Sequence, residues 1–184
     1  MTLQLDVAGR LAPGDVLCYR PSSLFGWAIR IKTGGPQSHA ELYVGNQLSI
    51  ASRDRVGTGL YPLRLPQLGW VLRPIGQFNV QSCMSWFIRE GKNQKYGLLD
   101  LITFFGFPVN APGVVCSPFV VYALRAGGIP AFGTTPPERI APNDLVLSEL
   151  LSDVSALVLM GDLTRPVRKP VTSLSGNVVA SPGI

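Results

Sequence analysis

The chain contains one histidine and three cysteines, and two of these residues stand where chemistry is expected. His39 is the only histidine, so any reaction that uses an imidazole side chain must use this residue. A cysteine made nucleophilic by a neighbouring histidine is the commonest chemistry that needs only one of each. Among the cysteines, Cys116 leads directly into an apolar helical run. We therefore take Cys116 and His39 as a candidate nucleophile and its general base.

The residues after Cys116 favour a helix that would activate its thiol. Ser117 and Pro118 can cap and open this helix, and the pair Gly127-Gly128 can end it. The first turn of a helix carries partial positive charge and unpaired N–H groups, and both favour a thiolate. A nearby imidazolium lowers the thiol pKa further, and the same N–H groups could form an oxyanion hole. The alternative is structural, with a half-buried strand histidine and a small buried cysteine.

Hydrophobic periodicity and turn residues predict the elements that must position this pair. In the segment 37–45, apolar residues alternate with His39, Glu41 and Tyr43, which predicts a strand with these three side chains on one face. Residues 53–66, which contain glycine and proline, favour a loop with short extended pieces. Further strands are expected at 16–20, 47–52, 70–74 and 155–160, and helices at 24–32, 80–90, 96–105, 117–126 and 142–151.

Length and composition favour one globular domain. With 184 residues, of which 46% are hydrophobic and 15% charged, the chain can bury a sizeable core. We expect a lead-in at 1–10, the domain at 11–162 and an extended tail at 163–184. No apolar run reaches the roughly 18–20 residues that span a bilayer, and the N-terminus lacks a secretory-signal pattern. We expect cytoplasmic synthesis, with any outside target reached through a phage particle, a secretion system or lysis.

Charge distribution and cysteine spacing argue against several classes of function. The net charge of +5 comes from 16 Lys and Arg against 11 Asp and Glu, and the basic residues are scattered. No predicted helix carries a basic stripe interleaved with aromatic residues, so a specific nucleic-acid partner is not expected. Three cysteines at unrelated spacings and one histidine fit neither a disulfide framework nor a zinc site. No metal or other cofactor is expected.

Several segments carry a resemblance to a known enzyme group. They are PGDVLCYRP at 13–21, SHAELYVG at 38–45 and CSPFVVYALRAGGI at 116–129, with shorter matches at 96–98 and 141–145. In order and spacing they resemble the circularly permuted NlpC-like cysteine hydrolases, the YiiX/YaeF group, which is related to lecithin retinol acyltransferase. The resemblance implies a permuted papain-like α+β fold. In such a fold an antiparallel sheet packs against a few helices, including the helix that bears the nucleophile.

The same resemblance implies roles for particular residues. Cys116 is expected to be the nucleophile and His39 the general base. Ser38, Tyr96 and Ser117 are candidates to line the substrate cleft.

The group usually has a polar residue, often glutamate or histidine, on the strand after the histidine, where it holds the imidazole. The matching positions in this chain are Ala51 and Ser52. Ser52 could orient the ring through its hydroxyl, and Glu41, which shares a strand face with His39, could do so through its carboxylate. Both candidates stay open from the sequence alone. A further difference is Pro118, where the group more often has a polar residue.

The sequence thus predicts a cysteine hydrolase of the peptidase or amidase type, with peptidoglycan peptides as its substrate. The tail at 163–184 would dock to a protein carrier or assembly. Two other hypotheses stay open. One is a binding or structural module on the same fold whose site has decayed, as in a phage or secretion-system component. The other is a lipid acyl-ester or thioester hydrolase or acyltransferase, with the apolar run 98–107 as its acyl-chain groove.

Overall fold

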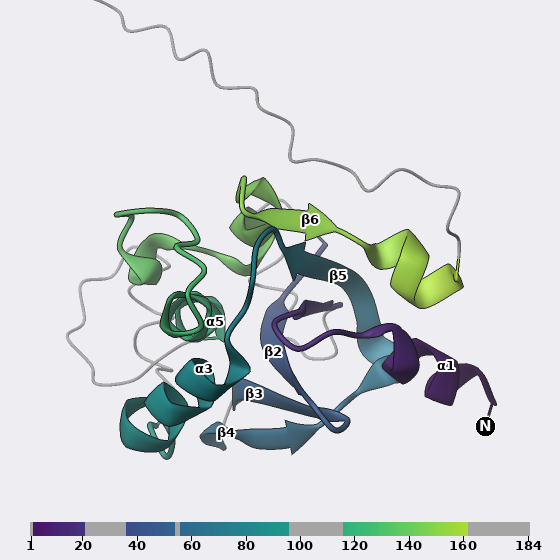
Figure 1. Ribbon diagram of the computed structural model, residues 1–184, viewed down its shortest axis with the longest axis horizontal. Helices are drawn as coiled ribbons and strands as arrows, with labels where there is room; N and C mark the ends of the chain where they lie inside the picture. Colours follow the sequence, from purple (N-terminus) through teal and green to yellow (C-terminus); the bar gives the residue numbers. More distant parts are fainter. Residues whose placement is uncertain (1, 21–35, 54–55, 96–115, 162–184) are drawn as a thin grey trace, which may run out of the picture.

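The computed structural model describes residues 2–20, 36–53, 56–95 and 116–161. Within these residues, six antiparallel strands form one sheet in the order β4-β3-β2-β1-β5-β6 (Figure 1). Helices pack on the sheet, so the α+β class with an antiparallel sheet is confirmed. The strands are β1 (Val16–Tyr19), β2 (His39–Gly45), β3 (Leu48–Arg53), β4 (Gly57–Pro62), β5 (Leu68–Pro74) and β6 (Leu151–Asp153).

Strand β2 forms where the sequence alternates, because alternate residues then face two different apolar environments. Ala40 and Leu42 belong to the main hydrophobic core, and the residues that alternate with them along β2 face the other side of the sheet. β2 pairs with β1 in a register that sets Cys18 opposite Ala40 and Tyr19 opposite His39. Its expected hairpin partner is confirmed as β3. His39 therefore stands at the end of β2 that adjoins the end of β1.

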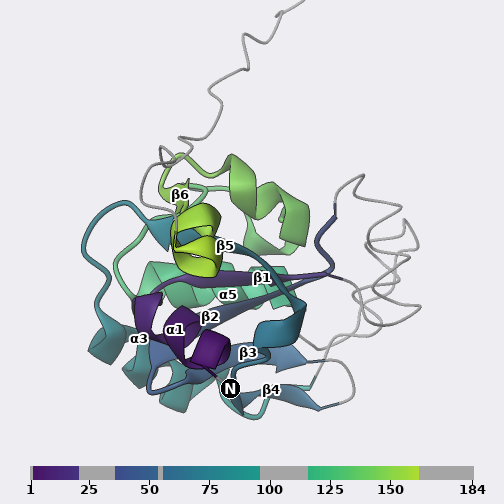
Figure 2. The same ribbon diagram turned by 90° about the vertical axis from the view of Figure 1, so that its right-hand side faces the viewer.

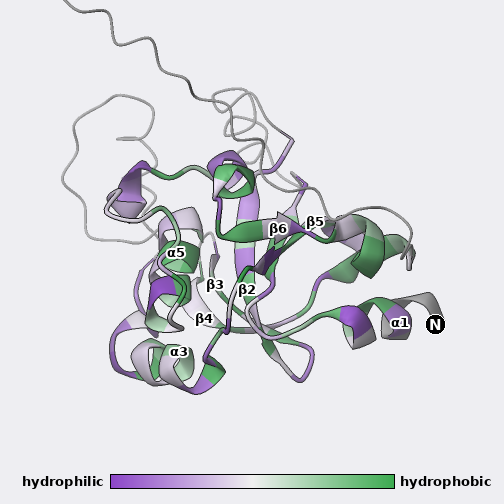
Figure 3. Ribbon diagram, turned by 45° about the horizontal axis from the view of Figure 1, so that its top comes forward, coloured by the Kyte–Doolittle hydropathy of each residue, from purple (hydrophilic) through white to green (hydrophobic). Residues whose placement is uncertain are grey.

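Helix α5 (Cys116–Ala126) is buried along most of its length and packs against β2. Its apolar residues join the main core, and hydrophobic residues of α5 and the strands are green in Figure 3. Helix α3 (Val80–Trp86) lies beside α5 and continues as the π-helical turn Phe87–Gly91 (η2). The side chain of Asn79 caps α3 by accepting the N–H of Ser82.

The opposite side of the sheet carries a second, smaller apolar cluster. Helix α1 (Thr2–Arg10) and the π-helical turn Ala156–Met160 (η5) lie on this side, away from α5, in the two perpendicular views of Figures 1 and 2. Val7 of α1 and Val158 of η5 both pack in the cluster. The segment expected as a lead-in thus contributes a helix to the packed structure.

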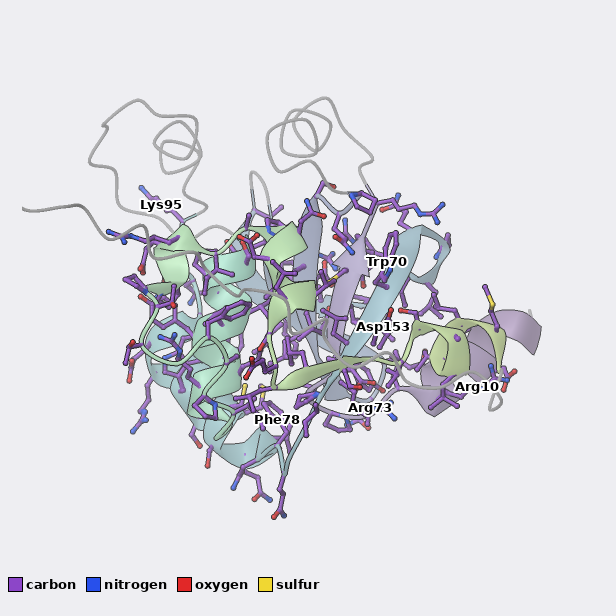
Figure 4. The ribbon with its side chains drawn as sticks, turned by 90° about the horizontal axis from the view of Figure 1, so that it is seen from above. Arg10, Trp70, Arg73, Phe78, Lys95 and Asp153 are labelled. Carbon is purple, nitrogen blue, oxygen red and sulfur yellow. The ribbon has the colours of Figure 1, made fainter. Side chains whose placement is uncertain are left out.

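A buried ion pair ties the start of β1 to β5. Asp15 is fully buried and accepts two hydrogen bonds of 2.8 Å from the guanidinium of Arg73. Arg73 also donates to the backbone carbonyl of Arg10, and both arginines are labelled in Figure 4. The N–H of Ala12 donates to the same carboxylate at 2.8 Å. These hydrogen bonds join the residues just before β1 to β5. The ion pair therefore fixes the position of the chain where it enters β1.

The prediction of a strand at 155–160 is wrong, because Ala156–Met160 forms a helical turn. Asp153 accepts hydrogen bonds from the N–H and the hydroxyl of Ser155 just before the turn. Gly161 ends the turn in the left-handed conformation, with φ 68°. An unbroken apolar run fits a buried strand and a buried helical segment equally well. The residues at the two ends of the run therefore determine which of the two forms.

Two other segments also differ in type from the prediction. Within 53–66, where a loop with short extended pieces was expected, β4 is a regular strand that pairs with β3 over its whole length. Within 142–151, the expected short helix is a 3-10 helix, Pro142–Leu147 (η4), followed at the end of the segment by β6. Two further 3-10 turns are Leu65–Gln67 (η1) and Pro137–Arg139 (η3).

Some predictions concern segments outside the described residues, namely the helices at 24–32 and 96–105 and the tail at 163–184. In the part of the chain that the structure describes, no helix combines the length and the hydrophobicity needed to cross a membrane.

Candidate active site

His39 begins β2, and the backbone on either side of it is held by the sheet. The N–H of Ser38 donates to the carbonyl of Tyr19 at 3.1 Å, which extends the pairing of β1 and β2 beyond His39. The Tyr19 ring tilts against the imidazole, with 6.0 Å between the ring centroids. Only 17% of the His39 side chain is exposed. The imidazole is therefore held by packing as well as by its hydrogen bonds.

The side chains of Cys116 and His39 are hydrogen-bonded to each other. Because Nε2 of the imidazole lies 3.1 Å from Oε1 of Glu41, Nδ1 is the ring nitrogen left for the sulfur. The backbone N–H groups of Ala40 and Ser117 also hydrogen-bond to the sulfur. Cys116 is the first described residue of α5, and Ala40 belongs to β2, so the sulfur lies between the helix and the sheet. The fold thus brings together the two candidates that lie far apart in the sequence.

Glu41 completes a chain of three side chains. Its carboxylate is fully buried and contacts the imidazole through Oε1. Arg53 of β3 makes a two-point contact, donating to Oε1 at 2.9 Å and to Oε2 at 3.1 Å. Ser49 of β3 donates its hydroxyl to Oε2 at 2.5 Å, and Arg64 donates to Oε1 at 2.7 Å. These donors hold a charged carboxylate in a buried position next to the imidazole.

The three groups shift one another's protonation equilibria. Burial raises the pKa of the Cys116 thiol, but the hydrogen bond and charge of His39 and the two backbone N–H groups outweigh it, so the net pKa is lowered. Burial lowers the pKa of His39, but the contacts with Cys116 and Glu41 outweigh it and raise the pKa to about 9. Both shifts favour the thiolate–imidazolium form of the pair over the neutral form.

The pKa of Glu41 is also lowered. Burial alone would raise it, and the hydrogen bonds from His39, Arg53 and Ser49 reverse that effect. Glu41 therefore stays ionised and favours the imidazolium form of His39. The other two cysteines behave differently, because burial raises the pKa of Cys83 to about 12 and also raises that of Cys18. Of the three thiols, only that of Cys116 is activated.

The two candidates for the third residue lie on opposite faces of the sheet. Glu41 is on the face from which Ser49 and Arg53 of β3 reach it. Ser52 alternates with these two residues and shares the face of Ile50, which belongs to the main core. Glu41 is thus the candidate whose carboxylate is within hydrogen-bond distance of the imidazole.

The three cleft candidates have different surroundings. Ser117 is buried, and its hydroxyl donates to the carbonyl of Ile140 at 2.6 Å, so this side chain anchors the start of α5. Its N–H is the group that faces the sulfur. Ser38 is also buried, immediately before the imidazole. Tyr96 lies outside the described residues. Pro118 lies in the first turn of α5, where its missing N–H costs no helical hydrogen bond.

Sequence reasoning missed the partners of Glu41. Arg53 follows Glu41 by 12 positions and Arg64 by 23, and neither spacing marks a motif. Ser49 is opposite Tyr43 in the hairpin, and its hydroxyl reaches Glu41 from the neighbouring strand. The one available signal was the predicted pairing of 37–45 with 47–52, which would bring residues near 49–53 beside Glu41.

The arrangement has the parts needed for nucleophilic attack on a carbonyl. It holds a thiol whose pKa is lowered, an imidazole whose raised pKa favours its protonated form, a carboxylate that orients the ring, and backbone N–H groups beside the sulfur. Among the described residues, no three His, Cys, Asp or Glu side chains gather as a possible metal site. In comparisons with known proteins, no protein-family model matches this chain, and no curated protein is significantly similar to it.

Proposed function

We propose that this protein is a cysteine hydrolase that cleaves an amide bond through a covalent thioester. The observation that carries the proposal is the continuous chain from Cys116 through His39 to Glu41. A buried thiol with a lowered pKa beside an imidazole with a raised pKa is costly as a purely structural arrangement, because both charges are removed from water. Such shifts cluster at functional sites.

The first half of the reaction is acylation. The Cys116 thiolate attacks the carbonyl carbon, a C–S bond forms, and the carbonyl π electrons move to the oxygen. The imidazolium of His39 then donates its proton to the amide nitrogen, the C–N bond breaks, and the amine leaves. Glu41 holds the ring in position through Nε2 while Nδ1 faces the sulfur. The enzyme is left as a thioester with a neutral imidazole.

The second half is hydrolysis of the thioester. His39 takes a proton from a water molecule, which attacks the thioester carbonyl. The C–S bond breaks, the carboxylic acid leaves, and the thiolate–imidazolium pair is restored. The oxyanion of each tetrahedral intermediate would accept hydrogen bonds from N–H groups at the start of α5, such as that of Ser117 beside the sulfur.

The proposed substrate is an amide bond in a peptidoglycan peptide, on a permuted papain-like fold. This part of the proposal rests on the resemblance of the segments around His39 and Cys116 to the permuted NlpC-like hydrolases. Consistent features are the antiparallel sheet, the histidine at the start of a strand and the cysteine at the start of the helix packed on it.

The main argument for the alternative of a decayed site is weakened. That hypothesis drew on the absence of a strong third residue, and Glu41 occupies this role geometrically. The alternative of a lipid acyl group as substrate drew on residues 98–107, which lie outside the described residues.

The proposal is tested by incubating the purified protein with soluble peptidoglycan fragments and identifying new amines and carboxylic acids by mass spectrometry. Cleavage by the wild type and loss of cleavage in Cys116→Ala are expected. Cys83→Ala, which changes another buried cysteine, is the matched control and should retain cleavage. Absence of cleavage together with an unreactive Cys116 would contradict the proposal.

A further inference from the structure

The carboxylate of Glu41 receives more hydrogen bonds than it can accept well. Among the described residues, four side chains make five contacts with it, whereas a carboxylate offers about four lone-pair sites. Three of these contacts converge on Oε1, from His39, Arg53 and Arg64. The imidazole therefore shares its oxygen with two guanidinium groups. Positive charge is also in excess, since two arginines and the His39 imidazolium outnumber the Glu41 carboxylate and the Cys116 thiolate.

Arg64 is the least firmly held of these cationic partners. Its side chain is 36% exposed, compared with 18% for Arg53 and 17% for His39. It contacts Glu41 through one nitrogen, whereas Arg53 makes a two-point contact. Its Nε is buried and has no hydrogen-bond partner among the described residues, so within this part of the chain the guanidinium is only partly satisfied.

Arg64 is also linked to His39 through Tyr19 and through the carboxylate of Glu41. Its guanidinium lies 4.9 Å above the ring of Tyr19, and that ring packs against the imidazole of His39. Arg64 and His39 bind the same carboxylate oxygen. A cation that is partly exposed, in excess over the local negative charge and bound to the same carboxylate as His39 is suited to binding an anion.

We propose that Arg64 recognises a carboxylate on the substrate, and that the enzyme therefore prefers anionic substrates. This inference rests on the function proposed above and names a class of substrate for the same site. Binding of the substrate carboxylate would draw the guanidinium from Oε1 and leave that oxygen to His39 and Arg53. Binding of the anionic group would thus also improve the orientation of the imidazole.

Two alkylating reagents of equal size test this without knowledge of the substrate. Iodoacetate carries a carboxylate and iodoacetamide a neutral amide. Both react when the Cys116 thiolate forms an S–C bond and iodide leaves. The rate at Cys116 is measured with each reagent by digestion and mass spectrometry. We expect the ratio of the iodoacetate rate to the iodoacetamide rate to exceed that of free cysteine.

The variant Arg64→Gln should lower this ratio by roughly three- to fivefold, the scale of one partly exposed ion pair. Arg64→Lys, which keeps the charge, should retain most of the ratio. Arg20→Gln is the matched control, because Arg20 is exposed, follows Tyr19 in the chain and stacks over Trp70 instead. Its ratio should stay at the wild-type value. Circular dichroism of each variant checks that the fold is retained.

The outcomes separate this inference from the proposed function. Rapid reaction with iodoacetamide, but a ratio equal to that of free cysteine or unchanged in Arg64→Gln, overturns the role of Arg64 and leaves the activated thiol intact. An equal loss of the ratio in Arg20→Gln also overturns it, because the preference would then come from general charge. Slow reaction with both reagents would show that the Cys116 thiol is not activated, and both proposals would then fail together.

Discussion

Gln37 and Asn143 are joined by two hydrogen bonds of 3.0 Å across a large separation in the chain. The backbone N–H of Gln37 donates to the side-chain oxygen of Asn143, and the side-chain amide of Asn143 donates to the backbone carbonyl of Gln37. Gln37 precedes His39 by two residues, and Asn143 lies in the 3-10 helix η4. This contact fixes the chain where it enters β2 and so positions the imidazole.

Asn143→Ala should therefore slow alkylation of Cys116 at neutral pH severalfold and cost about 1–3 kcal/mol of stability, because two buried backbone groups lose their partner. Iodoacetamide kinetics and urea unfolding measure the two effects. Asn79→Ala is the matched control, since it removes the cap of α3 and costs about 1 kcal/mol away from the site. A similar slowing in both variants would show that the effect comes from stability alone.

The reactivity of Cys116 should depend on pH in a way that reports the pair. Its pKa is lowered from 9.0, so alkylation should be rapid at neutral pH, where an ordinary thiol reacts slowly. In His39→Ala the pKa of this buried thiol should rise, and reaction should require alkaline pH. Hydrolysis needs the imidazolium as a proton donor, so it should decline as pH rises through about 9. A rate profile that is identical with and without His39 would exclude an activated pair.

Glu41 should make the fold sensitive to acid. Its pKa in the folded protein is lowered from 4.5, so its contribution to stability is complete above pH 4.5 and is lost as pH falls below that value. Glu41→Gln should remove this acid dependence and cost about 3–5 kcal/mol at neutral pH, because Arg53 loses its buried partner. Urea unfolding at several pH values measures both effects.

The control for Glu41 is Asp6→Asn, which removes the exposed pair between Asp6 and Arg10 and should cost less than about 1 kcal/mol. If Glu41→Gln kept the wild-type acid dependence, another carboxylate would have to be its source.

The ring of Phe78, labelled in Figure 4, lies against two glycines that have no room for a side chain. A Cβ atom on Gly127 would lie 2.1 Å from the ring, and one on Gly14 would lie 2.6 Å from it. Gly127→Ala should therefore destabilise the protein by about 1–3 kcal/mol through overpacking. The smaller side chain in Gly127→Ala/Phe78→Leu should restore part of the loss in thermal unfolding. Additive losses in the double variant would mean that the clash is not the cause.

Much of the fold could be predicted because its signals are local. Alternation around Ala40 and Leu42 predicts β2, and the cap and glycine signals around Cys116 predict α5. β4 was predicted only as a short extended piece of a loop, because glycine and proline are poor strand formers and its pairing with β3 depends on the neighbouring strand. The segment 155–160 was assigned wrongly because an apolar run has no period that separates a strand from a helical turn.

The candidate site could be predicted only in part. His39 and Cys116 could be selected because the chain has one histidine and one cysteine at a predicted helix start, and because the segments around both resemble a known enzyme group. The choice between Glu41 and Ser52 could not be made, because it depends on which face of the sheet carries Arg53 and Arg64. Those contacts form through the three-dimensional arrangement of separate strands and loops, and no short spacing in the sequence encodes them.

The burial of α5 has a consequence for how the protein loses its activity. A helix whose residues are nearly all in the core cannot detach locally, so its backbone amides should exchange with deuterium only when the whole domain opens. The nucleophile at its first residue depends on the same cooperative unit as the core. Thiol activation and tertiary structure should therefore disappear over the same range of denaturant, in one transition.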